Sequence, residues 1–296
     1  MAAARTRRER NAATGVAVSM IVSLAFDRAR ELAYARDLAR AFGGALLFGL
    51  PLLMTMEMWW FGFLLEPWRL AVFLLAAVPL LLGLAFYAGF SASHRGLGHA
   101  LLDTLVALAV GFLTAAATLS LLGVLEAGAP PRQIAGQLLL QAVAGAMGAL
   151  LAGRQLSSGR DEDVGDEDQA SYPGELFLMV AGALFLALNM APTEEMILIA
   201  YRMTAIHVVA LMAVSLMLMH AMVYSIGLPG QETHDRPLAA FVHYTLPGYA
   251  LVLLTSLAVL WVFGRTEGHG LAETVDAMVV LGFPGAIGAA AARLLV

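Results

Sequence analysis

Cysteine and lysine are both missing from this chain of 296 residues. Without cysteine the protein forms no disulfide, has no thiolate nucleophile and holds no thiolate-bound metal, which excludes redox dithiols and zinc fingers. Without lysine no Schiff base forms on a lysine amine, which excludes a retinal-bearing opsin. The sequence also lacks Walker, GxSxG and HExxH motifs, so it carries no signature of nucleotide hydrolysis or of a known hydrolase. We therefore expect the protein not to be an enzyme.

Charged residues are scarce, at 13% of the chain, whereas hydrophobic residues make up 60%. A typical soluble domain has about 25% charged and about 45 to 50% apolar residues, so this composition is that of a membrane protein. Four of the basic residues crowd the N-terminus, at Arg5, Arg7, Arg8 and Arg10, which is typical of a cytoplasmic topology signal beside an anionic leaflet. Nothing in this charge distribution indicates nucleic-acid binding.

The first 40 residues are predicted to stay outside the bilayer core. The apolar run at 14–26 has 13 residues, fewer than the about 20 that a spanning helix needs. The stretch 27–40 then places opposite charges three or four residues apart, as on the solvated face of a helix. We interpret 1–40 as a basic tail with an interfacial helix. A signal peptide cleaved near Ala33-Tyr34-Ala35 is the alternative, but the intervening charges argue against it.

From Ala41 on, eight apolar runs of spanning length alternate with short breaks, which predicts an all-α polytopic transmembrane bundle. The loop 156–173 contains six acidic residues and is predicted to be a solvated cytoplasmic linker between two halves of four helices each, 41–155 and 174–296. The expected spans are about 41–64, 68–90, 100–125, 133–153, 174–201, 205–227, 239–263 and 271–295.

A short motif occurs once in each half, as PLLMTMEMWW at 51–60 and as NMAPTEEM at 189–196. Aligned without a gap, the two copies pair Thr55 with Thr193 and Glu57 with Glu195. The offset is 138 residues here, 141 for the third helices and 140 for the fourth. This near-constant spacing predicts a duplication. Because each unit has an even number of spans, the two repeats are predicted to be parallel.

The arginines are unevenly distributed between the two predicted sides of the membrane. With the N-terminus inside, 13 arginines face the cytoplasm and four face outward. The positive-inside rule therefore predicts that both termini are cytoplasmic.

Carboxylates inside the apolar runs are the candidate functional residues, because an ionisable side chain within a span is costly. At a rise of about 1.5 Å per residue, Glu57 and Glu195 lie roughly 10 to 12 Å below the outer boundary and Asp276 at about 9 Å. We predict an ion-binding or permeation site around these acids. Its members are Glu57, Glu195, Glu194, Asp276, Thr55 and Thr193, with Asp103, His220 and His243 as a candidate proton path.

Two interpretations of these acids remain open. Carboxylates brought together at low dielectric cannot all stay ionised, so either a cation such as calcium or sodium sits between Glu57 and Glu195, or a proton is shared. Carbonyls freed near Pro51, Asn189 and Pro192 would add metal ligands. In the competing interpretation the acids and histidines only hydrogen-bond to neighbouring helices and fix their packing. No other cofactor is expected.

The segment LPLLMTMEMWW at 50–60, together with PTEEM at 192–196, resembles a family of bacterial integral membrane proteins that has no assigned activity. The resemblance covers the chain from residue 40 or so to its end. It implies a multi-helix fold in the bacterial inner membrane and assigns no role to any residue.

The sequence as a whole favours a transporter or channel for a proton or small cation. The alternative is a scaffold or accessory subunit whose acidic loop binds a partner. A third hypothesis, an intramembrane enzyme acting on lipid, lacks a recognisable nucleophile or metal motif. Bilayer lipids and the permeant ion are the expected partners, and both a monomer and a homo-oligomer remain open.

Overall fold

The computed structural model describes residues 31–32, 34–88, 96–126, 128–157, 171–224 and 237–294. The chain divides into two compact units, Met1–Arg40 and Ala41–Val296. In the first unit the described residues are helical. The apolar run 14–26 and most of the acidic linker lie outside the described residues.

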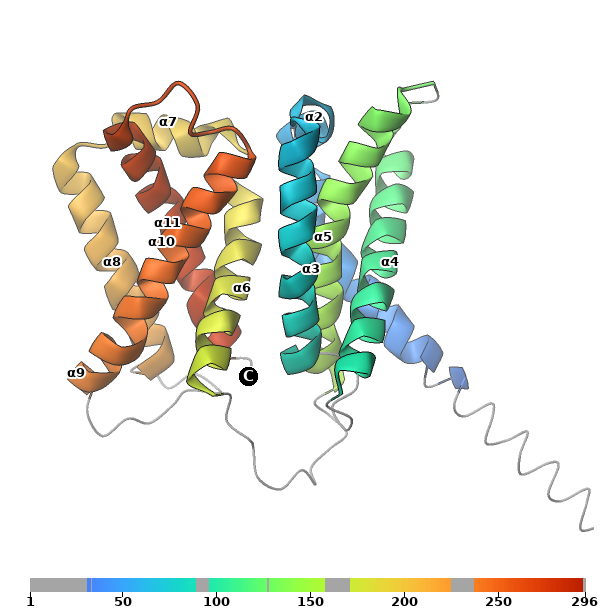
Figure 1. Cartoon of the computed structure of the whole chain (residues 1–296), viewed down its shortest axis with the longest axis horizontal. Helices are drawn as coiled ribbons and strands as arrows, with labels where there is room; N and C mark the ends of the chain where they lie inside the picture. The colour runs from blue at the N-terminus through green and yellow to red at the C-terminus, as the bar shows by residue number, and fades with distance from the viewer. Residues whose placement is uncertain are drawn as a thin grey trace, which may run out of the picture. The chain divides into compact units, whose positions relative to one another are not determined.

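The second unit is built from helices throughout its described part, which confirms the predicted all-α bundle. Seven helices are long and apolar enough to cross a membrane, and eight if the bent pair Tyr34–Leu53 and Met56–Leu64 counts as one span. After Tyr34–Leu53, the elements in Figure 1 are α2 (Met56–Leu64), α3 (Pro67–Ala88), α4 (Leu97–Leu121), α5 (Pro131–Ser157), α6 (Tyr172–Met190), α7 (Glu194–Arg202), α8 (Ala205–Tyr224), α9 (Pro237–Ala240), a π-helix (Phe241–Thr245), α10 (Leu246–Val262) and α11 (Leu271–Leu294).

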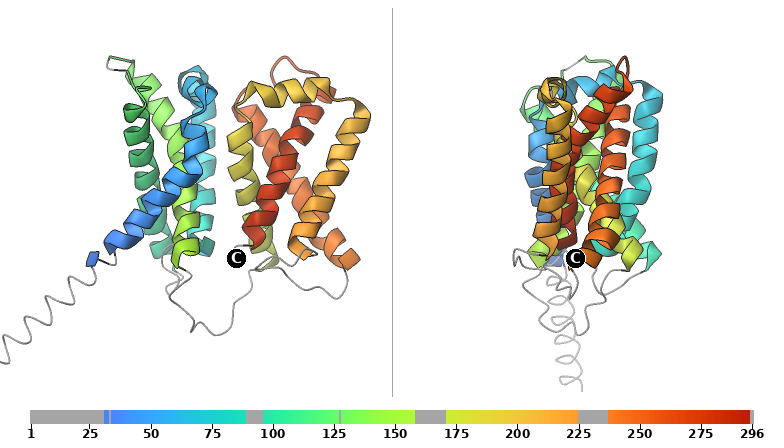
Figure 2. Two further views of the ribbon diagram at one scale, coloured as in Figure 1. Left: turned by 180° about the vertical axis from the view of Figure 1, so that it is seen from behind. Right: turned by 90° about the vertical axis from the view of Figure 1, so that its left-hand side faces the viewer.

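One central helix organises each half. In the first half α2, α3 and α4 pack on α5, and in the second half α6, α7, α8 and α10 pack on α11. In their most apolar stretches α5 is 78% buried inside the protein and α11 61%, whereas α8 is 22% buried. The halves meet through contacts of α3 and α5 with α6, and of α3 with α10. Figure 2 shows the two groups of helices from behind and from the side.

Helix boundaries recur at matching positions in the two halves. The short helices α2 and α7 begin at Met56 and Glu194, which are 138 residues apart and both start helices of nine residues. Gly123 after α4 and Gly264 after α10 both adopt positive φ, 71° and 69°, as the glycine that follows a helix C-terminus often does. These correspondences support a duplication, whereas the parallel relation of the two repeats stays a prediction.

Two of the expected spans are interrupted, which corrects the prediction of single helices over 41–64 and 174–201. The helix Tyr34–Leu53 meets α2 at a bend of 83°. In the second half α6 ends at Met190, and α7 begins four residues later as a separate helix. As a result α7 runs across the end of the second half, which Figure 1 shows.

Local chemistry explains both breaks. Thr55 and Thr193 precede the short helices with extended backbone, and their hydroxyls donate to carbonyls of the preceding segment, Pro51 O and Met190 O. Such side-chain bonds compete with helical hydrogen bonds. Pro192 also has no N–H to donate to the carbonyl four residues before it, which weakens the helix at this position.

Glycines let the central helices approach their neighbours at backbone distance. A Cβ built on Gly182 of α6 would lie 2.1 Å from the carbonyl oxygen of Gly288 in α11. On the other side of the molecule, a Cβ on Gly148 of α5 would lie 2.6 Å from the carbonyl oxygen of Gly44. The glycines of α5 and α11 therefore serve packing, as is usual in membrane bundles.

Candidate functional site

The breaks bring polar groups to one end of the bundle, here called the upper end (Figure 1). This end carries α2, α7 and the loop 263–270. Glu57 lies in the first turn of α2, and Glu194 and Glu195 lie in the first turn of α7. Acidic side chains are favourable at this position because the N-terminal end of a helix carries partial positive charge. Glu57 is half-buried, and the other two glutamates are exposed.

The glutamates belong to two separate helix contacts. α2 packs on α5, whereas α7 packs on α11. Within the described part of the chain, no three His, Asp or Glu side chains gather closely enough to hold a metal ion. A metal site between Glu57 and Glu195 thus stays a prediction. The depths estimated for both residues assumed straight helices, and the breaks remove that assumption.

Side chains already engage the carbonyls at the breaks. The hydroxyl of Thr55 donates to Pro51 O, and the indole N–H of Trp59 donates to Leu53 O at 2.8 Å. In the second half Thr193 donates to Met190 O at 2.8 Å and Arg265 donates to Pro192 O at 2.6 Å. A carbonyl oxygen accepts two hydrogen bonds, and Met190 O already receives its second, from the backbone N–H of Thr193 at 3.1 Å.

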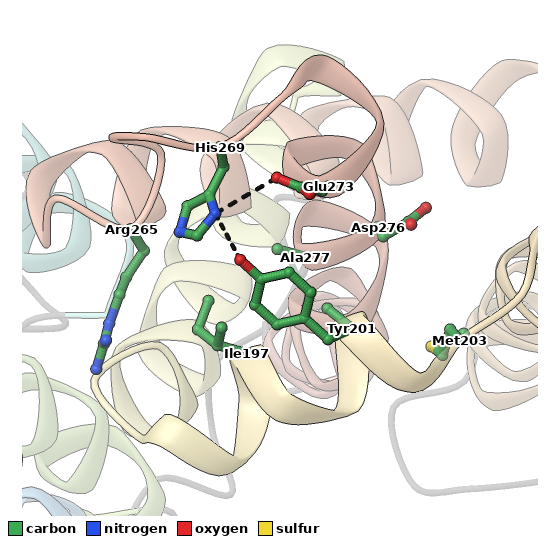
Figure 3. Close-up of a pocket in the computed structure, with 9 residues that line it drawn as sticks. Ile197, Tyr201, Met203, Arg265, His269, Glu273, Asp276 and Ala277 are labelled. Atoms are coloured by element: carbon green, nitrogen blue, oxygen red, sulfur yellow. Dashed lines mark hydrogen bonds and ion pairs between the residues drawn. The ribbon is translucent and has the colours of Figure 1, made fainter.

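A polar pocket lies between α7 and the start of α11. It has a volume of approximately 200 Å³, and Figure 3 shows its lining. Tyr201 Oη and His269 Nδ1 share a hydrogen bond of 2.7 Å, and the same nitrogen lies 3.5 Å from a carboxylate oxygen of Glu273. The backbone N–H of Gly270 donates to Glu273 at 2.9 Å, which fixes this carboxylate at the helix start. The arrangement gathers a phenol, an imidazole and a carboxylate into one polar cluster.

Asp276 lines this pocket, but Glu195 does not. In Figure 3 the Asp276 side chain points away from His269, and the guanidinium of Arg265 points away from both carboxylates. The sequence therefore indicated one residue of this pocket and missed Tyr201, His269 and Glu273. Their spacing gives a partial signal, because His269 and Glu273 are four residues apart around the start of an apolar run.

The predicted proton-path residues lie on different elements. His220 in α8 is half-buried, and its Nδ1 lies 2.9 Å from the hydroxyl of Thr245. His243 belongs to the π-helix and is exposed, and its backbone carbonyl accepts a hydrogen bond of 2.9 Å from Tyr172. Asp103 lies in the second turn of α4 in the other half. The described contacts join His220 to the π-helix without joining Asp103 to either histidine.

Sequence reasoning missed Arg69, which joins the halves at the upper end. Its side chain, 8% exposed, forms an ion pair with Glu267 and donates to the carbonyl of Trp261 at 2.9 Å. The guanidinium also lies 5.3 Å from the ring centre of Trp68 and 5.6 Å from that of Trp261. The sequence analysis counted Arg69 among the four outward-facing arginines, but it contained no information on which helices this side chain would join.

We expect Arg69→Gln to lower the free energy of unfolding by about 2 kcal/mol, from the lost carbonyl bond and ring contacts. The ion pair adds little, because the side chain of Glu267 is 65% exposed and solvent screens it. Chemical denaturation in detergent measures the change. Arg132→Gln, at an exposed position of the same end, is the matched control and should be near neutral. Equal effects of both substitutions would contradict the contact assignment.

A second missed group lies at the opposite end of the second half. Arg293 in the last turn of α11 forms an ion pair of 2.7 Å with Glu175 in the first turn of α6 and donates to the hydroxyl of Tyr224. The guanidinium lies 4.4 Å from the ring centre of Tyr244. The Arg293 side chain is 3% exposed and that of Glu175 is 15% exposed, so this is a buried ion pair. The sequence interpretation used Arg293 only as a topology signal.

We compared the sequence of this bundle with models of known protein families. Residues 37–296 match the model of a family described as "Putative integral membrane protein (DUF2391)". The chain belongs to this family. The match covers both halves and all described spans, and the family carries no assigned function, as the sequence resemblance implied. No curated protein and no solved structure matches the chain.

Proposed function

We propose that this family member passes a proton or a small cation across the membrane through polar sites at its two helix breaks. The supporting observation is that the first long helix of each half ends at a corresponding position, before a short helix with a carboxylate, Glu57 or Glu195, in its first turn. Interrupted helices at matching places in two halves are a recurrent feature of ion and substrate sites in transporters.

Each half contributes its own site in this proposal. In the second half, Glu194, Asp276 and the pocket residues Glu273 and His269 extend the polar region beyond Glu195. The lower end of the bundle, where α6 begins and α11 ends, would face the cytoplasm of a bacterial inner membrane, in line with the arginine distribution.

Flux into proteoliposomes tests the proposal. We expect the Glu57→Gln, Glu195→Gln double variant to lose proton or cation uptake down to the level of empty liposomes. The exposed Glu126→Gln, at the same end, is the control and should retain wild-type uptake. A wild-type protein without flux, or a double variant with unchanged flux, would remove the proposal.

A scaffold function is the second candidate, and the buried Arg293–Glu175 pair favours it because it joins helices without opening a path between them. Stability separates the two candidates. If the double variant unfolds in detergent and no ion alters the melting temperature of the wild type, Glu57 and Glu195 act in packing.

A further inference from the structure

Two glutamines of α5 are buried one turn apart with free polar atoms. Gln137 and Gln141 are each 2% exposed. The side-chain N–H of Gln137 donates to the carbonyl of Trp59 at 3.2 Å, but its Oε1 has no hydrogen-bond partner among the described residues. Both the oxygen and the nitrogen of the Gln141 amide are also without a described partner. Residues four apart share a helix face, with Cβ atoms about 5 to 6 Å apart.

A threonine of α4 lies at the same height. Gly111 contacts α5 directly, because a Cβ built there would lie 2.4 Å from the carbonyl oxygen of Ala142. Thr114 follows one turn closer to the upper end, and its neighbour Ala115 packs in one cluster with Leu138. Thr114 is 4% exposed, and its hydroxyl has no described partner.

This group of side chains lies level with the first helix break. Gly49 of the helix Tyr34–Leu53 lies against Gly145 of α5. The two helices are antiparallel, so one turn further along brings Leu53, the last residue before the break, level with Gln141. Leu53 and Leu138 indeed pack in the same cluster. The free amides thus lie beside the break that precedes Glu57.

The chemistry of the free groups restricts what can bind there. They include acceptors, Oε1 of both glutamines, and a donor, Nε2 of Gln141, together with a hydroxyl that can act as either. A bare cation would satisfy the oxygens and leave the amide N–H unpaired. A small neutral molecule with both donors and acceptors satisfies all of them, and water is the smallest.

We propose that Gln137, Gln141 and Thr114 hold ordered water inside the first half, next to the break before Glu57. A buried water typically makes about three hydrogen bonds, which these free groups supply. α5 is the most buried span, so the amides cannot turn toward lipid headgroups or bulk solvent. The inference goes beyond ion transport, because the site binds water whether or not an ion crosses.

The second half provides an internal reference. The residues 140 positions after Gln137 and Gln141 are Ala277 and Leu281, both buried and neither able to bind water through its side chain. At these two positions the second half therefore has no counterpart of the glutamine amides.

Hydroxyl-radical footprinting by X-ray radiolysis tests this on the full chain in nanodiscs, because bound water generates radicals beside buried side chains. We expect Leu138 and Leu140 to be modified although they are buried, and Leu281 to be protected. Modification of both leucines should fall to the Leu281 level in the Gln137→Leu, Gln141→Leu variant. Gln133→Leu, the same change at a partly exposed position of α5, should leave it unchanged.

The outcomes separate clearly. If Leu138 and Leu140 of the wild type are as protected from modification as Leu281, the inference is wrong. This comparison does not depend on the folding of any variant. Labelling that persists unchanged in a folded double variant would overturn it as well. If replacing sodium by N-methylglucamine changes the labelling of these leucines or the melting temperature, the site binds a cation instead of water, and the inference is wrong. Flux measurements do not enter this test, so failure of the proposed transport function leaves it intact.

Discussion

Replacing Arg293 by methionine is expected to lower the free energy of unfolding by about 3 to 5 kcal/mol, the usual cost of breaking a buried ion pair by removing one of its members. The substitution removes the 2.7 Å ion pair with Glu175 and the bond to the Tyr224 hydroxyl. It leaves a carboxylate that is 15% exposed within the bundle. Thermal and chemical denaturation in detergent measure the loss.

Two further variants assign this loss of stability to the broken ion pair. Removing both charges, by Arg293→Met together with Glu175→Gln, should recover most of the stability, since a buried pair as a whole contributes little. Arg202→Met, at the exposed end of α7, should be near neutral. A double variant as unstable as the single one would show that Arg293 acts through packing against Tyr244 and not through its charge.

The adjacent glycines Gly43 and Gly44 should respond to alanine with opposite signs. A Cβ on Gly44 would lie 2.2 Å from Cβ of Ala152 and 2.6 Å from the carbonyl oxygen of Gly148, so α5 would have to move away. We expect Gly44→Ala to destabilise by about 1 to 3 kcal/mol, the typical cost of overpacking. A Cβ on Gly43 meets no atom within 4 Å. Gly43→Ala should stabilise by up to about 1 kcal/mol through helix propensity.

Melting curves of the two variants under one detergent condition provide the measurement. Because the residues are neighbours in one helix, differences in propensity and in membrane depth cancel. If Gly44→Ala stabilised the protein as much as Gly43→Ala, the close approach of the first helix to α5 would be wrong.

The spans were predictable because hydropathy reports what lipid requires. Runs such as Pro67–Ala88 and Ala205–Tyr224 are strongly apolar, and a helix satisfies all their backbone hydrogen-bonding groups within the segment, as a bilayer requires. The offsets of the repeat were equally visible, since they depend only on the order of residues.

The breaks were not predictable from the same signal. Leu52, Leu53 and Met54 continue the apolar run through the bend before α2, so hydropathy does not change where the direction of the helix does. The decisive contacts are the hydroxyl bonds of Thr55 and Thr193 to preceding carbonyls. A threonine in an apolar run makes such a bond in a straight helix as well, so its presence alone does not locate a break.

The candidate site was only partly predictable for a related reason. Sequence analysis selects carboxylates that are unusual for their surroundings, and Glu57, Glu195 and Asp276 met this criterion. It provides no means of pairing residues distant in the chain, such as Arg69 with Glu267 or Arg293 with Glu175. Buried glutamines are still harder to recognise as site residues from the sequence, because only the packing around α5 shows that Gln141 has free donor and acceptor groups.

The central helix of each half is also the last helix of that half to be synthesised. α5 follows α2, α3 and α4 in the chain, and α11 follows α6, α7, α8 and α10. Each central helix thus enters the bilayer when the neighbours that will surround it are already present, which shelters the amides of Gln137 and Gln141 from acyl chains during biogenesis. Each half can close during translation, the first before the second is made.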